Sequence, residues 1–211
     1  MKRKGFSVTE LLVSVGLIGL MAGILLPVVG KARESARRVQ CASNLRQIGT
    51  GMEMYEQTYK KLPADEAGSA IGSHRDGQFT PYGMGWLYET GCLPNLRVFF
   101  CPSATRSDPD GEYGVQNWGK DNAPSVATSY LWRLYPIRND ETRGGNRAPP
   151  YRKEQQSRAM DNIHKLWDKL HDWQFVNALY RDGSVRGIPS SESELRANQG
   201  IDEMFEWADK K

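Results

Sequence analysis

Residues 6–30 read FSVTELLVSVGLIGLMAGILLPVVG, and this stretch decides the fold because no charge interrupts it after Glu10. The twenty uncharged residues 11–30 are enough to cross the hydrocarbon core of a bilayer as one helix. A cleaved secretory signal has an apolar core of about 7–15 residues and a small-residue cleavage site. Since this run is longer and ends without such a site, the sequence predicts a retained membrane helix.

The rest of the 211-residue chain has a different composition. Apolar residues make up 39% of the whole, while the charged residues, 25% of the chain, lie almost entirely outside the apolar run. This asymmetry excludes a plain soluble enzyme, a fully disordered chain and a multi-spanning transporter. We therefore expect a protein with a single membrane anchor and a polar body.

Net charge gives no indication of a nucleic-acid partner. The formal charge is +3, but Lys2, Arg3 and Lys4 supply three of the 28 basic residues, and the remaining 25 balance 25 acidic ones. Charge also leaves the orientation in the membrane open, because basic residues flank both ends of the run. Those beyond its carboxyl end are Lys31, Arg33, Arg37 and Arg38.

Glu10 breaks the apolar pattern four residues after Phe6. A carboxylate at that depth in a bilayer costs about 2.5–3.5 kcal/mol unless it is paired, so it is a candidate functional residue. The alternative is an acidic residue in the first turn of the helix, where the helix dipole favours it.

Small residues in the run favour close helix packing. Gly19 and Gly23 are four residues apart, the spacing at which two membrane helices approach closely. The alternative is that glycine is simply common in membrane helices. Pro27 removes one backbone hydrogen bond and is expected to kink the helix.

Residues 4–13, KGFSVTELLV, resemble the prepilin signal of type IV pilins and type II secretion pseudopilins. The resemblance implies that a prepilin peptidase cuts between Gly5 and Phe6 and that Phe6 becomes N-methylated. Glu10 then corresponds to the family's glutamate, and Pro27 to its helix-kinking proline. The implied location is the bacterial inner membrane, crossed once, with the leader in the cytoplasm and the body on the periplasmic side.

The same resemblance implies a mechanism of assembly into a filament. The amine freed at Phe6 would pair with Glu10 of a neighbouring subunit, and a low-dielectric setting strongly favours such a pair over two unpaired charges. The predicted assembly residues are Phe6, Glu10, Gly19, Gly23 and Pro27.

Residues 40–49, QCASNLRQIG, are similar to a large family of bacterial pilin-like proteins, many of which carry a carboxyl-terminal His, nine residues and Asp-Gly. Weaker similarities occur at 98–103, 128–130 and 176–185. Asp182-Gly183 fits the end of that motif, but ten residues separate His171 from Asp182, one more than the pattern has.

The helix is predicted to continue beyond the membrane, from about Ser7 to Tyr59, with Leu62-Pro63 ending it. We expect a leader at 1–5, a transmembrane and assembly helix at 6–30, its extramembrane continuation at 31–62 and a globular body at 63–211. An amphipathic stripe would lie against the body: Ala32, Ala36, Val39, Ala42, Leu45, Ile48, Met52 and Tyr55.

The body is predicted to be α+β, with the long helix packed on a small antiparallel β-sheet with long loops, as in pilins. Asp182-Gly183 between two β-prone runs indicates a hairpin, with metal binding by Asp182 as the alternative. Ser191 and Glu194 form a capping-box pattern that opens a short helix. A last amphipathic segment, with Ile201, Met204, Phe205 and Ala208, is expected to dock on the body.

Three cysteines are present. Cys92 and Cys101 bracket an apolar run and are a possible disulfide, with two buried thiols as the alternative. Cys41, on the long helix, would then be the odd thiol.

Two groups of residues are candidate metal ligands. Asp108, Asp110 and Glu112 surround Gly111 and are a weak calcium candidate, although a solvated turn explains these residues better. His164 and His171 lie near acidic residues but match no known metal spacing. Calcium is thus the only possible cofactor, and none is required.

These observations predict a non-enzymatic structural subunit of a type IV pilus-like or type II secretion pseudopilus filament. Its expected partners are copies of itself, other pilin-like subunits, the prepilin peptidase, the inner-membrane assembly machinery and the lipid bilayer. The alternative is a membrane-anchored extracytoplasmic hydrolase, or a metal- or ligand-binding protein. That alternative needs His171, Asp182 or the 108–112 loop to converge in one pocket.

Overall fold

The structure is a computed structural model of the whole chain. It describes residues 7–61, 63, 68–75, 78–104, 108–121, 123–132, 157–161, 174–197 and 201–211. The predicted leader with its cleavage site at Gly5 and Phe6, and both His164 and His171, lie outside the described residues.

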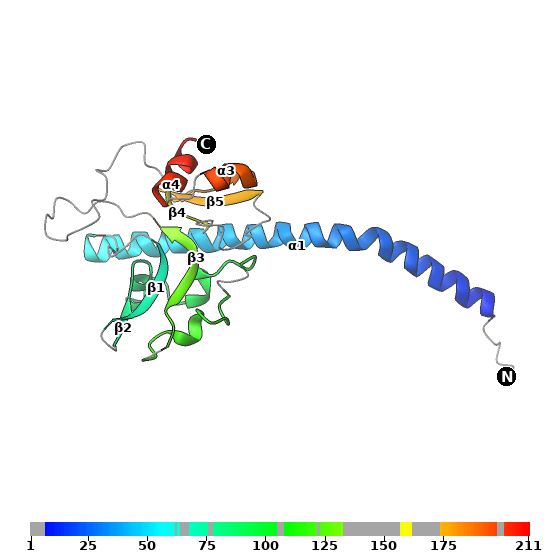
Figure 1. Ribbon diagram of the computed structural model, residues 1–211, viewed down its shortest axis with the longest axis horizontal. Coiled ribbons are helices and arrows are strands. Elements are labelled where there is room, and N and C mark those ends of the chain that lie inside the picture. The colour runs from blue at the N-terminus through cyan, green and yellow to red at the C-terminus, as the bar shows by residue number, and fades with distance from the viewer. Residues whose placement is uncertain are drawn as a thin grey trace. The chain divides into compact units, whose positions relative to one another are not determined.

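A single helix, α1, spans Val8–Tyr59, 52 residues, and confirms the predicted helix to within one residue (Figure 1). It is helical on both sides of Pro27, which lies inside α1. By its contacts the chain forms two compact units, residues 1–36 and 37–211. The carboxyl-terminal part of α1 therefore folds with the body.

The body contains one six-stranded antiparallel sheet, which confirms the predicted α+β class. The strands lie in the order β2-β1-β3-β4-β5-β6, so five of them keep their order along the chain. Their bounds are β1 Gly68–Arg75, β2 Gln78–Pro81, β3 Val126–Trp132, β4 Ser157–Asp161, β5 Phe175–Tyr180 and β6 Val185–Pro189.

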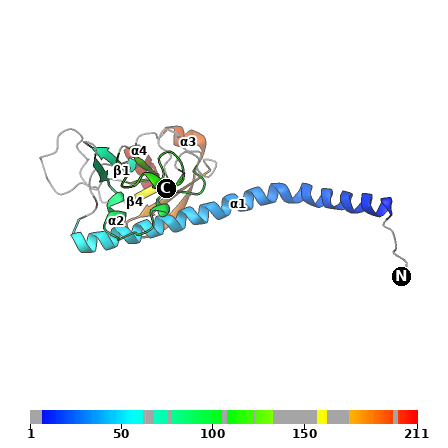
Figure 2. The ribbon, with the colours of Figure 1, turned by 90° about the horizontal axis from the view of Figure 1, so that it is seen from below.

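The sheet packs between α1 on one face and two short helices on the other. Leu179 of β5 joins the cluster that includes Leu45 and Ile48 of α1, whereas its neighbours Ala178 and Tyr180 join a cluster with the carboxyl-terminal helices. This alternation follows from the strand geometry, in which successive side chains point to opposite faces. Figure 2 shows the arrangement from a second direction.

The carboxyl-terminal helices are α3 (Glu192–Ala197) and α4 (Ile201–Asp209). The capping box is confirmed at α3, where the backbone N–H of Ser191 donates to the Glu194 carboxylate at 3.1 Å and the Glu194 N–H donates to Ser191 Oγ at 3.4 Å. The docking of the last segment is also confirmed, because Met204, Phe205 and Ala208 are buried.

The apolar residues 86–88 and 96–99 lie in short helices. They are α2 (Gly85–Glu89) and the 3₁₀ helix η1 (Leu96–Phe99), followed by a second 3₁₀ helix, η2 (Val115–Asn117). The predicted hairpin is confirmed, since β5 and β6 pair in antiparallel register around Asp182-Gly183, with Gly183 at φ +77°.

The predicted stripe on α1 is correct only in its second half. Leu45, Ile48, Met52 and Tyr55 are buried, but Ala32, Ala36 and Val39 are exposed and Ala42 is half-buried. The reason is that Cys41 is the first buried residue of α1. Periodicity alone does not show at which residue the rest of the body begins to pack on a helix.

Candidate functional site

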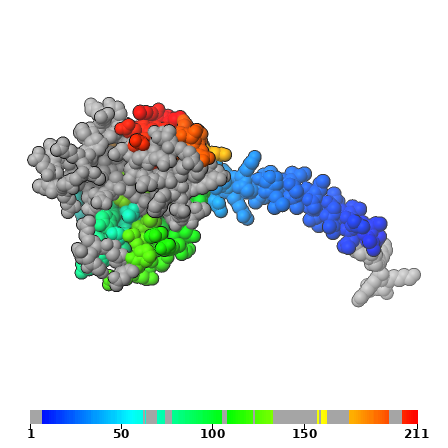
Figure 3. Space-filling model, in the orientation of Figure 1, coloured from blue at the N-terminus to red at the C-terminus, as the bar shows by residue number. Residues whose placement is uncertain are grey.

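The first half of α1 exposes its apolar side chains. Fourteen large hydrophobic residues between Val8 and Val29 are 45–74% exposed, and the blue part of Figure 3 shows this surface. By length and composition this helix qualifies to cross a membrane, as an anchor or as a signal sequence. It is the principal exposed apolar surface that the described residues present.

Glu10 lies at the start of this surface and caps the helix. The backbone N–H of Ser7 donates to Glu10 Oε2 at 3.0 Å, in the manner of the second half of a capping box. This contact agrees with the alternative interpretation of Glu10 as a first-turn acid. Glu10 is nevertheless exposed, on a helix face that it shares with Thr9, Val13, Ser14 and Leu17.

The two glycines at close-packing spacing are open to the outside. A Cβ atom added at Gly19 or Gly23 would meet no atom within 4 Å. Because four residues return nearly to the same helix face, the two positions leave one shallow strip without side chains. Pro27 lies four residues beyond Gly23 on the same helix.

Residues 92–103, which we call the strap, run antiparallel to α1 along the body. At one end, a Cβ added at Gly51 would lie 3.3 Å from Leu93 Cβ and 3.5 Å from the Cys92 carbonyl oxygen. At the other end, the Asn44 side chain donates to the Phe100 carbonyl at 3.0 Å. The strap therefore follows α1 from Gly51 back towards Cys41.

The disulfide joins Cys41 to Cys101, with their Cα atoms 5.3 Å apart, so the possible Cys92–Cys101 bridge is not the one that the folded protein contains. Cys92 is a free, half-buried thiol. The strap explains the difference, because its Cys92 end lies beside Gly51 and its Cys101 end beside Cys41. These points on α1 are ten residues, or about 15 Å, apart.

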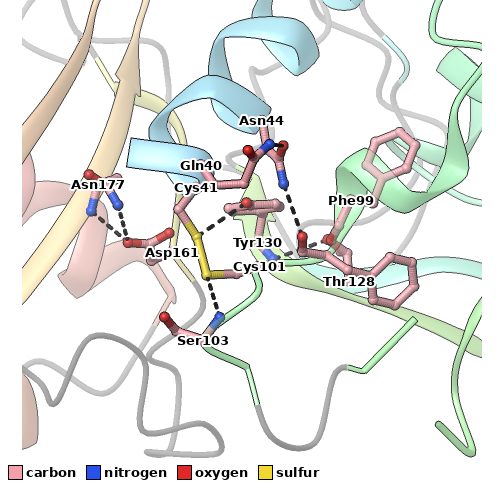
Figure 4. Close-up of a disulfide and its surroundings, with 11 residues drawn as sticks. Gln40, Cys41, Asn44, Phe99, Cys101, Ser103, Thr128, Tyr130, Asp161 and Asn177 are labelled. Atoms are coloured by element: carbon pink, nitrogen blue, oxygen red, sulfur yellow. Dashed lines mark hydrogen bonds between the residues drawn. A yellow bond between two sulfur atoms is a disulfide. The ribbon is translucent and has the colours of Figure 1, made fainter. Parts of the chain in front are cut away.

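Buried polar groups surround the disulfide (Figure 4). The Tyr130 hydroxyl lies 3.4 Å from Cys41 Sγ, and Thr128 Oγ1 donates to the Phe99 carbonyl. Burial, reinforced by the nearby Asp161 carboxylate, raises the pKa of Tyr130 well above its usual value. The phenol thus remains neutral, and the group acts as a structural hydrogen-bonding partner.

Asp161 is a completely buried carboxylate on β4. Its Oδ2 accepts from the Asn177 backbone N–H at 2.7 Å and from the Asn177 side chain at 3.1 Å. The sequence does not show that Asn44, Asp161 and Asn177 are buried hydrogen-bonding groups, since each lies in a run where nothing distinguishes a buried polar residue from an exposed one.

The acidic loop at 108–112 is organised as a turn. Asp110 forms a two-point ion pair with Arg97 at 2.6 and 3.3 Å, and Asp108 Oδ1 accepts from the Asp110 N–H at 2.9 Å. Within the described parts of the chain, no three His, Cys, Asp or Glu side chains form a group that could hold a metal ion. The structure therefore does not assemble Asp108, Asp110 and Glu112 into the calcium site considered above.

Asp182 serves the hairpin. Its Oδ1 accepts from Ser184 Oγ at 2.6 Å and from the Ser184 N–H at 2.9 Å, and its other oxygen lies 3.4 Å from Arg186. The Ser184 hydroxyl and N–H, then Arg186, lower the pKa of the Asp182 carboxyl below its usual value. These contacts explain Asp182 without a metal.

A hollow of about 270 Å³ lies between α1 and the strap, beside the disulfide. Amide groups, one guanidinium and apolar side chains line it. It contains neither Asp182 nor an acidic residue of the 108–112 loop. Its lining residues are Gln40, Asn44, Gln47, Asn95, Arg97, Val98, Phe100, Cys101, Pro102 and Pro109.

The protein is thus an α+β chain with an apolar N-terminal helix whose carboxyl-terminal part is embedded in a small antiparallel sheet domain. Residues 30–98, about a third of the chain, match a family described as SBP_bac_10, protein of unknown function (DUF1559). The match covers the end of the apolar run, the buried part of α1 and most of the strap. Neither the curated proteins nor the solved structures contain a match.

Proposed function

We propose that this protein is a non-enzymatic, pilin-like subunit that is anchored in the inner membrane and assembles into a filament through the first half of α1. The observation that carries the proposal is the change of environment along one continuous helix. Up to Val29 its side chains are exposed and mostly apolar, and from Cys41 onwards they enter the core of the body. Such a helix links an apolar environment to a folded domain.

The exposed apolar surface requires a cover. Fourteen large apolar side chains, each more than two-fifths exposed, would cost on the order of 1 kcal/mol apiece if left in water. Lipid can provide this cover before assembly, and helices of neighbouring subunits can provide it in a filament. The open strip at Gly19 and Gly23 gives such helices a place to approach closely.

Glu10 and Phe6 are proposed to set the register between subunits. After cleavage the amine of Phe6 would lie one turn before Glu10 in its own chain, and a neighbour shifted along the axis could present its amine to the exposed carboxylate. The Ser7 contact holds Glu10 at the helix surface without burying it.

The similarity of residues 4–13 to prepilin signals supports processing by a prepilin peptidase, with the body on the periplasmic side. The alternative, an anchored hydrolase or ligand-binding protein, gains no support from the described residues. Asp182 and the 108–112 loop are each engaged in contacts within their own turn.

Mass spectrometry of the mature protein tests the proposal. The chain is produced in membranes with a prepilin peptidase, and the expected product lacks residues 1–5 and carries one methyl group on the Phe6 amine. The control variant Gly5→Arg should remain uncut. An intact Met1 in the presence of active peptidase, or a cut beyond Gly30, would contradict the proposal.

A further inference from the structure

Cys41 and Cys92 are competing disulfide partners for Cys101. Cys101 lies nine residues from Cys92 and 60 from Cys41, with which it is bonded in the folded protein. The entropy cost of closing a flexible loop rises as three-halves of the logarithm of its length. In the unfolded chain Cys101 should therefore meet Cys92 about 17 times as readily as Cys41.

Folding reverses this preference. The strap holds Cys92 near Gly51 and Cys101 near Cys41, points that are about 15 Å apart along α1. A disulfide requires Cα atoms roughly 4.4–6.8 Å apart, a condition that Cys41 and Cys101 meet at 5.3 Å. The bridge that forms most easily in the unfolded chain is thus incompatible with the strap lying along α1.

We propose that Cys92 is the first disulfide partner of Cys101 and passes it to Cys41 as the strap closes on the helix. In the first step the thiols of Cys92 and Cys101 lose two protons and two electrons to a disulfide-bearing oxidant, which becomes a dithiol. In the second step the Cys41 thiolate attacks Cys101 Sγ, and the bond between Cys101 and Cys92 breaks. Cys92 leaves as a thiolate and takes up the proton that Cys41 gave, so this step needs no further oxidant.

The folded structure makes the transfer one-way. Cys41 and Cys101 are 0% and 1% exposed, so the finished bridge is shielded from thiols in solution. Cys92 remains as a half-buried thiol, with Thr90 Oγ1 3.4 Å from its sulfur. The proposal gives this third cysteine a role in maturation, and it stands independently of the filament function.

Oxidative refolding of the full chain tests this. The reduced protein, unfolded in guanidinium chloride, is diluted into detergent micelles with oxidised and reduced glutathione, and samples are quenched by alkylation. Peptide mapping should find the Cys92–Cys101 bridge about 17 times as abundant as Cys41–Cys101 at the earliest times. The Cys41–Cys101 bridge should then replace it as tryptophan fluorescence reports folding.

Two variants keep the test decisive. Cys41→Ser should stop at the Cys92–Cys101 bridge and so fail to close the strap on α1, because it has no Cys41 thiolate to displace Cys92. Cys92→Ser should reach Cys41–Cys101 through a glutathione adduct instead. The proposal is overturned if the wild-type chain forms Cys41–Cys101 from the start, with the other bridge below a tenth of it. It is equally overturned if Cys41→Ser leaves Cys92 and Cys101 as thiols in the same buffer.

Discussion

Asn44 and Phe100 are joined by a buried hydrogen bond in which the Asn44 side-chain amide donates to the Phe100 backbone carbonyl at 3.0 Å. The bond lies beside the Cys41–Cys101 disulfide and ties the strap to α1. The Phe100 carbonyl explains why the polar residue Asn44 lies on the buried face of α1, because a buried carbonyl needs a hydrogen-bond donor.

We expect Asn44→Ala to lower the free energy of unfolding of the body by about 1–3 kcal/mol, since it leaves the Phe100 carbonyl without this donor. The matched control is Gln47→Ala, which removes an exposed amide from the same helix and should change stability by at most about 0.5 kcal/mol. Urea unfolding in detergent, followed by tryptophan fluorescence, measures both. Equal midpoints for the two variants would contradict this role of Asn44.

Asp161 offers a comparison between charge and hydrogen bonding. Asp161→Ala removes the acceptor of the Asn177 N–H and side chain, and should cost about 1–3 kcal/mol. Asp161→Asn retains a carbonyl oxygen of similar size at that position and should cost less. If the asparagine variant proves as unstable as the alanine variant in the same urea experiment, the negative charge matters more than the hydrogen bonds.

Gly85 at the start of α2 is required by a close approach of backbone. A Cβ added there would lie 1.8 Å from the Ile71 carbonyl oxygen. Alanine is favoured over glycine within a helix by about 1 kcal/mol, but this clash requires β1 or α2 to move. We expect Gly85→Ala to lower the melting temperature, with a cost of about 1–3 kcal/mol or more.

Gly16→Ala is the control for this substitution, because a Cβ at Gly16 would meet no atom within 4 Å. It should leave the melting temperature of the body unchanged. If the Gly85→Ala and Gly16→Ala proteins have the same melting temperature, α2 and β1 do not approach each other as closely as the structure shows.

Local signals in the sequence were sufficient for the elements whose structure is determined locally. The apolar run and its continuing stripe predicted α1, Asp182-Gly183 predicted the β5–β6 hairpin, and Ser191 with Glu194 predicted the start of α3. In each of these cases the deciding contacts join residues that are near neighbours along the chain or repeat with the helix period.

Features that depend on distant contacts were not predictable in the same way. The possible Cys92–Cys101 pair is not formed, because proximity in sequence favours Cys92 whereas the strap places Cys101 beside Cys41. The exposure of Val39 was missed because only tertiary structure shows that the cover of α1 begins at Cys41. Buried Asn44 and Asp161 likewise acquire their partners from elements far along the chain.

Asp182 predicts a pH dependence. The pKa of Asp182 is lower in the folded body than in the unfolded chain. Its contacts with Ser184 therefore stabilise the fold at pH values above the ordinary pKa of an aspartate, about 3.9. That contribution is lost as the pH falls from there through the lowered pKa. We expect Ser184→Ala to raise the pKa of Asp182 and to reduce this acid sensitivity.

A carboxyl-carbon NMR titration of the wild type and of Ser184→Ala measures the shift directly. Arg186→Ala is the comparison, and it should raise the pKa less, because the Ser184 hydrogen bonds contribute more to its lowering than Arg186 does. An Asp182 that titrates identically with and without the Ser184 hydroxyl would rule out this account of the turn.

Glu10 tests the assembly function most directly. We expect Glu10→Ala to remain in the membrane, because its apolar run is intact, but to form no filaments, since the Phe6 amine of a neighbouring subunit loses its partner. Glu10→Asp keeps the charge on a shorter side chain and should retain partial assembly. Membrane fractionation, followed by electron microscopy of sheared filaments, measures both properties.

Because Glu10 also accepts from the Ser7 N–H, Ser7→Pro is the control: it removes that donor but keeps the carboxylate, and it should still polymerise. Normal filaments from Glu10→Ala would leave the helix cap as the only role of this residue.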